Sequence, residues 1–551
     1  MNNHAFVISK LCSEFGIRHA VICPGSRSAP LVFAFSRNKK IKTCVIVDER
    51  SAAYLALGMA QQLQKPVVLI CTSGTAALNF YPAIAEAYYQ KIPLVVLTAD
   101  RPEEYLNQQD GQMINQANVY DKHVRANINC TESTHQNKIQ DVLSKSMFPV
   151  FGPVHINVPL KEPLYILPES KIKIQKIKWN ESKTKSTNSY DKIIEPTKFY
   201  NKKIVVVGQL LPNKKLTQQI KNLQKQGFVI FADVVSNQQE SSFIKHFDFI
   251  ISNANSSVLK QLEPEFIISF GGPLVSKSLK TWLKNCSPKT HIRIQEDKNC
   301  KVNTYGNVTD FILGNPTNVL FKIAKQKQSN KQNSNLYLTS WQLLEKKAIN
   351  TLEHFMNSKN ESELKSVNLI LKTLPQNSQL QISNSSSIRY VSYAGLSQNK
   401  ISVFANRGVS GIDGCSSTAL GSAMITDQIV TLITGDLAFF YDRNAFWNEH
   451  NKSNLRVIIV NNNGGGIFNL IDGPQSQPEL EEFFLTKHKL TAKNLCKEFG
   501  LEYYFCRSNN QLKKTLHSFF NKSKTAKILE LKFDMDENAK EFLKFKNIKI
   551  Q

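Results

Sequence analysis

Short apolar runs rich in β-branched residues recur along the chain, and each ends at a polar or glycine-containing turn. Residues 428–434 (QIVTLIT) and 455–460 (LRVIIV) have this pattern, which predicts two strands. The interval 441–450 between them predicts a helix. The three segments together predict a βαβ unit, in which ligands bind at the carboxyl ends of the strands.

The same alternation of strand and helix patterns extends over the whole chain. Further strands are predicted at residues 45–47, 66–71, 93–98, 203–207, 228–232 and 266–270, and a helix rich in small residues at 416–424. Stretches rich in Lys, Ser, Thr, Asn and Gln at 170–191 and 325–335 separate three such regions. The sequence therefore predicts an α/β protein of three domains, 1–180, 181–345 and 346–551, each with a mostly parallel sheet flanked by helices.

Polar residues follow the two strands of the predicted βαβ unit. Gly435-Asp436 follows the first strand, and Asn462 and Gly464 follow the second. A hard cation such as Mg²⁺ prefers oxygen ligands and takes some of them from phosphates and water. Asp436 offers a carboxylate, Asn462 a side-chain carbonyl and Gly464 a backbone carbonyl, so this edge predicts a site for a diphosphate-bound cation. Two ordinary βα turns are the alternative, because Gly, Asp and Asn are common in turns.

A Gly-Asp pair followed after this interval by Asn-Asn resembles the metal and diphosphate motif of thiamine-diphosphate enzymes, although Leu437 stands where that motif usually has glycine. The resemblance implies thiamine diphosphate with Mg²⁺ or Mn²⁺ as cofactors. It also implies an acidic residue that contacts the aminopyrimidine ring. Glu49, at the start of a helix predicted to run to about Gln64, is the candidate, and a charge that complements the helix dipole is the alternative role. In related enzymes this glutamate and the metal site come from different subunits, which implies a homodimer, possibly a dimer of dimers.

Further segments narrow the resemblance to one family, and together they extend over nearly the whole chain. They are CPGSRS at 23–28, TSGTA at 72–76, ADRP at 99–102, GPVHIN at 152–157, NRG at 406–408 and GIDG at 411–414. These segments resemble the 2-succinyl-5-enolpyruvyl-6-hydroxy-3-cyclohexene-1-carboxylate synthases of menaquinone biosynthesis. The resemblance implies decarboxylation of 2-oxoglutarate and 1,4-addition of the resulting succinyl semialdehyde carbanion to isochorismate.

The family pattern also assigns roles to individual positions. It implies catalytic roles for Glu49, Ser26, Arg27 and Gln112, and substrate binding by Arg101, Lys277, Ser385, Arg389, Arg407, Phe468 and Ile471. It implies cofactor binding by Glu49, Ile412, Gly435, Asp436, Asn462, Gly464 and Ile467. Arginines suit these substrates because the planar guanidinium matches a carboxylate. The position after Lys277, where some members carry a second basic residue, is Ser278.

Composition and charge argue against a membrane, secreted or nucleic-acid-binding protein. No apolar run approaches the roughly 20 residues of a membrane span, and residues 1–20 lack the pattern of a signal peptide, so we expect a cytoplasmic protein without a membrane partner. The ten scattered cysteines predict reduced, mostly buried thiols. The net charge of +25 lies largely in Lys- and Asn-rich stretches without a nucleic-acid-binding motif, so no nucleic-acid partner is expected. Three alternatives remain. The chain could be another thiamine-dependent 2-oxoacid decarboxylase or carboligase, similar to acetolactate synthase. It could also be a catalytically silent cofactor-binding protein or a nucleic-acid-binding protein.

Overall fold

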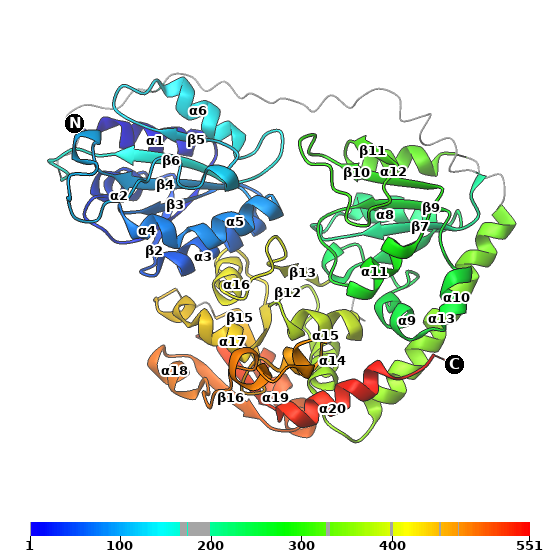
Figure 1. The fold of residues 1–551 in the computed structure, drawn as a ribbon. Coiled ribbons are helices and arrows are strands. Elements are labelled where there is room, and N and C mark those ends of the chain that lie inside the picture. The colour runs from blue at the N-terminus through cyan, green and yellow to red at the C-terminus, as the bar shows by residue number, and fades with distance from the viewer. Residues whose placement is uncertain are drawn as a thin grey trace.

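The computed structural model describes residues 2–165, 174, 199–326, 331–396, 400–450, 453–471 and 473–550. Three parallel sheets flanked by helices form three domains, as predicted (Figure 1). The predicted boundary between residues 180 and 181 lies outside the described residues. The boundary between 345 and 346 falls inside the long helix α13 (Lys331–Asn357), which extends from the middle domain to the C-terminal domain.

The N-terminal sheet has six parallel strands in the order β2-β1-β3-β4-β6-β5. Their bounds in chain order are β1 (His19–Ile22), β2 (Lys42–Val45), β3 (Val67–Cys71), β4 (Leu94–Asp100), β5 (Asn127–Asn129) and β6 (Val154–Pro159). Its helices are α1 (Asn3–Glu14), α2 (Ala29–Ser36), α3 (Glu49–Leu63), α4 (Thr75–Asn79), α5 (Tyr81–Gln90) and α6 (Gln136–Lys145).

The middle sheet has five parallel strands in the order β11-β10-β9-β7-β8. Their bounds are β7 (Lys203–Val207), β8 (Val229–Ala232), β9 (Phe266–Phe270), β10 (Thr290–Gln295) and β11 (Asp310–Leu313). The helices of this domain are α8 (Lys214–Gln224), α9 (Phe247–Asn253), α10 (Ser256–Gln261), α11 (Lys277–Asn285) and α12 (Pro316–Ala324).

The C-terminal sheet repeats the six-stranded arrangement in the order β13-β12-β14-β15-β17-β16. Its strands are β12 (Gln379–Ile382), β13 (Ser402–Ala405), β14 (Val430–Gly435), β15 (Leu455–Asn461), β16 (Glu502–Cys506) and β17 (Lys527–Lys532). Its helices after α13 are α14 (Glu363–Thr373), α15 (Ser386–Ala394), α16 (Cys415–Ala423), α17 (Asp436–Tyr441), α18 (Lys493–Glu498), α19 (Asn509–Phe520) and α20 (Met535–Lys546).

Two elements differ from the predictions. The predicted helix at 441–450 is wrong, because α17 begins at Asp436 and is followed only by a 3₁₀ turn, Arg443–Phe446. The helix ends at Asp442, whose buried carboxylate accepts hydrogen bonds from the Ser417 N–H and hydroxyl, each at 2.7 Å. The strand predicted at 45–47 lies earlier, at Lys42–Val45, where this edge strand pairs with β1.

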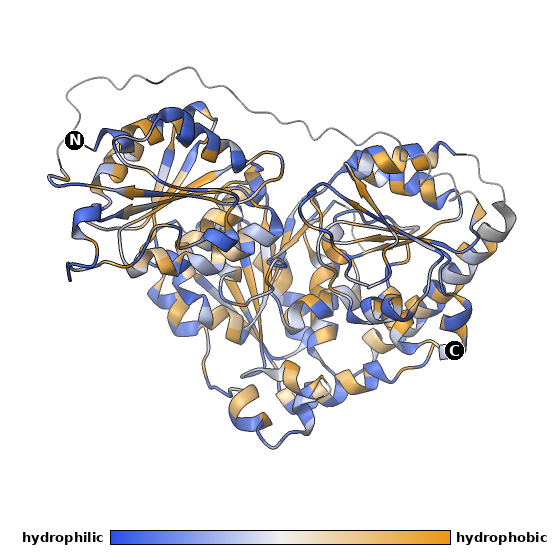
Figure 2. Cartoon of the chain, turned by 45° about the horizontal axis from the view of Figure 1, so that its top comes forward, coloured by the Kyte–Doolittle hydropathy of each residue, from blue (hydrophilic) through white to orange (hydrophobic). Residues whose placement is uncertain are grey.

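The core consists of sheet residues covered on both faces (Figure 2). Every residue of β3, β4, β9 and β15 is buried, which explains why these segments are continuous apolar runs instead of alternating ones. All ten cysteines are free thiols and all except Cys300 are buried, as predicted. No helix in the described part of the chain is both long and apolar enough to cross a membrane.

Helices α3 and α16 join the N-terminal and C-terminal domains. A Cβ on Gly58 of α3 would lie 2.1 Å from the Thr418 carbonyl oxygen, and one on Gly421 of α16 would lie 2.0 Å from the Leu55 carbonyl oxygen. The two backbones therefore approach so closely that only glycine fits at these contacts. This packing holds Glu49, the first residue of α3, in a fixed position relative to its own C-terminal domain.

Candidate active site

The carboxyl ends of β14 and β15 bring Asp436 and Asn462 to the same edge of the C-terminal sheet. These strands are parallel neighbours, with Gly435 opposite Val460. The Asp436 carboxylate accepts the Leu437 N–H at 2.7 Å and the Gly464 N–H at 3.0 Å. The Asn462 Oδ1 is buried and has no hydrogen-bond partner among the described residues. A buried amide oxygen without a partner beside a buried carboxylate fits a cation ligand.

The glycines after β15 leave no room for side chains. Gly464 has a φ of +155°, and a Cβ there would lie 2.4 Å from the Leu485 carbonyl oxygen. A Cβ on Gly466 would lie 2.5 Å from the Asn462 Nδ2. The loop therefore exposes its backbone to the space in front of Asp436. Within the described residues no group of three or more His, Cys, Asp or Glu side chains could hold a metal.

A cavity of about 230 Å³ opens in front of this edge. Its wall includes eight of the predicted site residues, which are Ser385, Ile412, Gly435, Asp436, Asn462, Gly464, Ile467 and Phe468. Leu437, Asn384 and Glu363 line it as well. Ile471 does not line it, although it follows Phe468 closely. Every described lining residue belongs to the C-terminal domain, between 363 and 468.

Cationic side chains gather beside this cavity. Arg407 donates to the Asn384 Oδ1 at 2.8 Å, and Asn384 lines the cavity. Burial lowers the pKa of Arg407, an effect that Asp233 and Glu86 oppose. Arg389, at the surface of α15, and Lys280, half-buried on α11, interact electrostatically with each other, and Lys280 also interacts with Arg407. Within the described part of the chain, no carboxylate lies within ion-pair distance of these three cations.

The first turn of helix α11 meets this group from the middle domain. Lys277 is exposed at the start of α11, and the Ser278 hydroxyl lies 2.7 Å from that of Ser252. Ser278 therefore faces α9, whereas Lys280, one helical turn after Lys277, lies near Arg389 and Arg407. Glu86 of the N-terminal domain holds the Arg407 loop from its other side, because its carboxylate accepts the Gly408 N–H at 2.7 Å and the Val409 N–H at 2.6 Å.

The remaining predicted residues form a second group, on the N-terminal domain. Arg27 is buried, donates to the Leu160 carbonyl at 3.1 Å and lies 3.2 Å from the Glu162 carboxylate. The Ser26 hydroxyl lies 3.0 Å from the Tyr165 hydroxyl. Burial raises the pKa of Asp100, the residue before Arg101, to about 6, and the nearby Arg27 opposes the shift. Ser26 and Arg27 follow β1, and Asp100 is the last residue of β4, so these side chains lie at the carboxyl edge of the N-terminal sheet.

Three more predicted residues belong to this group. Arg101 forms an ion pair with Asp110 at 2.9 Å and donates to the Gly111 carbonyl. Gln112 is exposed, with a φ of +54°, and its backbone packs against Gly74. Glu49 is half-buried at the start of α3. None of the residues in this second group lines the 230 Å³ cavity.

Comparison with known proteins identifies the family. A family model described as "Thiamine pyrophosphate enzyme, N-terminal TPP binding domain" matches residues 2–119, and one described as "Middle domain of thiamine pyrophosphate" matches 171–382. A 2-succinyl-5-enolpyruvyl-6-hydroxy-3-cyclohexene-1-carboxylate synthase from Cytophaga hutchinsonii is 41% identical, with 98% of this chain and 97% of the relative covered. This chain belongs to that synthase family. A synthase of the same name from Flavobacterium johnsoniae is 36% identical over 98% of both chains.

A solved structure agrees with the fold. Benzoylformate decarboxylase from Polynucleobacter necessarius superposes with a TM-score of 0.72 at 13% identity, covering 97% of this chain and 98% of that chain. At this identity the likeness concerns the fold alone. Membership of the synthase family establishes an enzyme of menaquinone biosynthesis that depends on thiamine diphosphate.

The structure of this synthase also brings residues to the site that the sequence did not predict. Glu363 and Asn384 line the cavity, and Lys280 joins the cation group. The His488 Nε2 lies 3.3 Å from the Asp436 carboxylate but is not aligned for a hydrogen bond. In the sequence Glu363 stands in a Ser-Glu start typical of a surface helix, so no local signal marks it.

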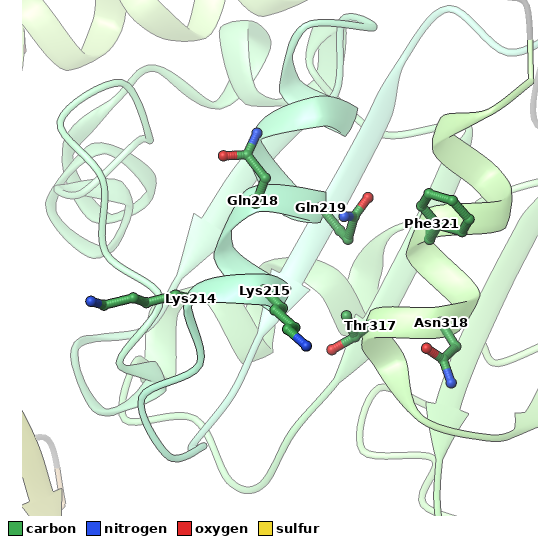
Figure 3. A pocket seen from close by; sticks show the side chains of 7 residues that line it. All are labelled: Lys214, Lys215, Gln218, Gln219, Thr317, Asn318 and Phe321. Atoms are coloured by element: carbon green, nitrogen blue, oxygen red, sulfur yellow. The ribbon is translucent and has the colours of Figure 1, made fainter.

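A second, larger hollow is separate from these residues. It lies between α8 and α12 of the middle domain, has a volume of about 410 Å³ and is open to solvent. Lys215 of α8 points toward Thr317 and Asn318 of α12 (Figure 3). None of the predicted site residues lines it.

Proposed function

We propose that the chain decarboxylates 2-oxoglutarate and adds the resulting succinyl semialdehyde unit to isochorismate by 1,4-addition, which gives 2-succinyl-5-enolpyruvyl-6-hydroxy-3-cyclohexene-1-carboxylate and CO₂. The observation that carries the proposal is the unpartnered Asn462 oxygen beside Asp436, in a cavity bordered by cationic side chains. This combination suits a cofactor diphosphate with its cation and a substrate that carries carboxylates.

The cofactor would lie along the carboxyl edge of the C-terminal sheet. Asp436, Asn462 and the Gly464 carbonyl would bind Mg²⁺ or Mn²⁺, and Gly435 leaves room for the diphosphate because nothing lies within 4 Å of a Cβ built there. Ile412 and Ile467 line the same cavity and would contact the cofactor rings. Thiamine diphosphate, when bound, supplies the carbanion chemistry.

Substrate carboxylates would bind the cation group. Arg407, which donates to Asn384, and Arg389 would bind these carboxylates through their planar guanidinium groups, and Lys277 of the middle domain would add a third cation. Phe468 and Ile471 would contribute apolar surface. Exclusion of water by such surface strengthens charge contacts and protects carbanions from protons.

Glu49, Ser26, Arg27, Arg101 and Gln112 would complete the site from a second copy of the chain. The cavity has no lining residue from the N-terminal domain, so one chain supplies only part of the predicted site. Apolar side chains are exposed beside Glu49, with Val45 at 55% and Val47 at 45% exposure. We infer a homodimer in which Glu49 of one chain holds a proton at the aminopyrimidine ring bound to the other.

The reaction is tested with purified protein, thiamine diphosphate and Mg²⁺. Release of CO₂ from 2-oxoglutarate is measured with and without isochorismate, while the absorbance of isochorismate is followed. Coupled consumption of both substrates is expected. Release of CO₂ that ignores isochorismate, or turnover of pyruvate alone, would instead assign the chain to another 2-oxoacid decarboxylase or carboligase.

The dimer is tested with two inactive variants, Glu49→Gln and Asp436→Ala. In a mixed dimer with shared sites, one site carries both substitutions and the other carries neither. Mixing the two variants, after dissociation and reassociation, is therefore expected to restore activity. If each chain forms its own site, every site keeps one substitution and the mixture stays inactive.

A further inference from the structure

A second carboxylate borders the cavity next to Asn462. Glu363 is the first residue of α14, lies 99 positions before Asn462 and is 1% exposed. Its Oε1 accepts a hydrogen bond from the Asn462 Nδ2 at 2.8 Å. Glu363 also lines the cavity together with Asp436 and Asn462.

This contact determines which end of the Asn462 amide faces Glu363. The Glu363 Oε1 is the acceptor of this hydrogen bond, so the amide turns its nitrogen, the donor end, toward Glu363. The amide oxygen then points away, and it is the atom without a partner among the described residues. Without Glu363, rotation of the amide by half a turn would place N–H groups where a cation needs an oxygen.

Glu363 itself is held firmly. Its backbone N–H donates to the Asn538 Oδ1 at 2.9 Å, and its carboxylate is hydrogen-bonded to the Tyr390 hydroxyl. The Asn538 Nδ2 reaches that hydroxyl in turn, at 3.3 Å. Tyr390 and Asn538 are both buried. A closed network from α14, α15 and α20 therefore fixes the carboxylate before any ligand binds.

We propose that Glu363 is a positioning residue for the metal site, which turns the Asn462 oxygen toward the cation. The inference rests on the proposed function, because it presumes that Asp436, Asn462 and Gly464 bind Mg²⁺ or Mn²⁺. Groups that orient metal ligands in this way typically change metal affinity by about 10- to 100-fold when they are removed.

Affinity for Mn²⁺ is the direct readout, measured in the presence of thiamine diphosphate from the electron paramagnetic resonance signal of free Mn²⁺. Glu363→Leu removes the acceptor and is expected to weaken Mn²⁺ binding by about 10- to 100-fold. Glu363→Gln keeps an acceptor oxygen for Asn462 and is expected to bind Mn²⁺ about as tightly as the wild type. In an Asn462→Ala background, Glu363→Leu should have no further effect, because its role passes through that amide.

Glu541→Gln is the matched control. Glu541 is a buried carboxylate that holds the same helix α14 through Lys365, at 2.9 Å, without touching Asn462. This variant should lower the thermal stability but leave Mn²⁺ affinity unchanged. Loss of affinity in the control equal to that of Glu363→Leu, equal loss in Glu363→Gln, or no loss in Glu363→Leu would each overturn the proposal. Failure of the wild type to bind Mn²⁺ would instead refute the proposed metal site, and the inference with it.

Discussion

Gly466→Ala tests how tightly the loop after β15 constrains the predicted metal site. The new Cβ would lie 2.5 Å from the Asn462 Nδ2, whereas ordinary van der Waals contact begins at 3.4 Å, so the amide must move by about 0.9 Å. Glu363 prevents it from moving without losing their hydrogen bond. Mg²⁺ requires near-ideal octahedral distances of about 2.0–2.1 Å, which a shift of this size disrupts.

We expect Mn²⁺ affinity to fall by about 10- to 100-fold, which corresponds to about 1.4–2.8 kcal/mol. The assay is titration of Mn²⁺ in the presence of thiamine diphosphate, together with a thermal unfolding scan. Glu541→Gln is again the control, since Glu541 pairs with Lys365 of α14 without touching Asn462. A Gly466→Ala protein that is folded and binds Mn²⁺ within a factor of about two of the wild type would refute the reasoning.

Three further predictions concern other parts of the molecule. Glu49→Gln should retain thiamine diphosphate but lose most turnover, whereas Asp436→Ala should lose the cofactor itself; equal retention in equilibrium dialysis would contradict this division of roles. Glu86→Gln weakens a charge-assisted hydrogen bond to the Arg407 loop that is worth about 1.5–3 kcal/mol. KM for the carboxylate substrates should therefore rise about tenfold or more. Glu14→Gln is the control, because Glu14 forms an exposed ion pair with Lys40, and it should leave KM unchanged. Burial raises the pKa of Asp442 from 3.8 to about 7, so the folded state retains a proton that the unfolded state loses, and the free energy of unfolding should fall as pH rises between these values. Asp442→Asn should make that decline shallower by about 1.4 kcal/mol per pH unit in denaturant titrations, and an unchanged slope would contradict the assignment.

The strands and the edge that carries Asp436 and Asn462 were predictable from sequence. Continuous apolar runs such as β15 mark strands that are buried on both faces, and parallel neighbours bring the residues that follow them together. The prediction of a helix at 441–450 is wrong because a tertiary contact determines where the helix ends. Asp442 binds Ser417 of α16 instead of continuing the helix, and no local pattern encodes that partner.

Residues that act through distant contacts were not predictable. Glu363 reaches Asn462 across 99 positions, and Lys280 approaches Arg389 and Arg407 only through the packing of the middle domain on the C-terminal domain. Their residue types are also common on helix surfaces, so composition gives no signal. Arg407 was predicted, by contrast, because it lies within a segment, NRG, that matches a family pattern.

The contact between α3 and α16 also has a consequence during synthesis. Gly58 and Ser422 touch across 364 positions of the chain, so the partner of α3 is made long after α3 itself. At about 5–20 residues per second, the ribosome needs on the order of 20–70 s to reach α16. Throughout that interval the small apolar face of α3, buried from Ser51 to Gln61 in the finished protein, is without its partner helix. The nascent N-terminal domain therefore exposes an apolar surface that molecular chaperones or a second nascent chain can bind before α16 packs against α3.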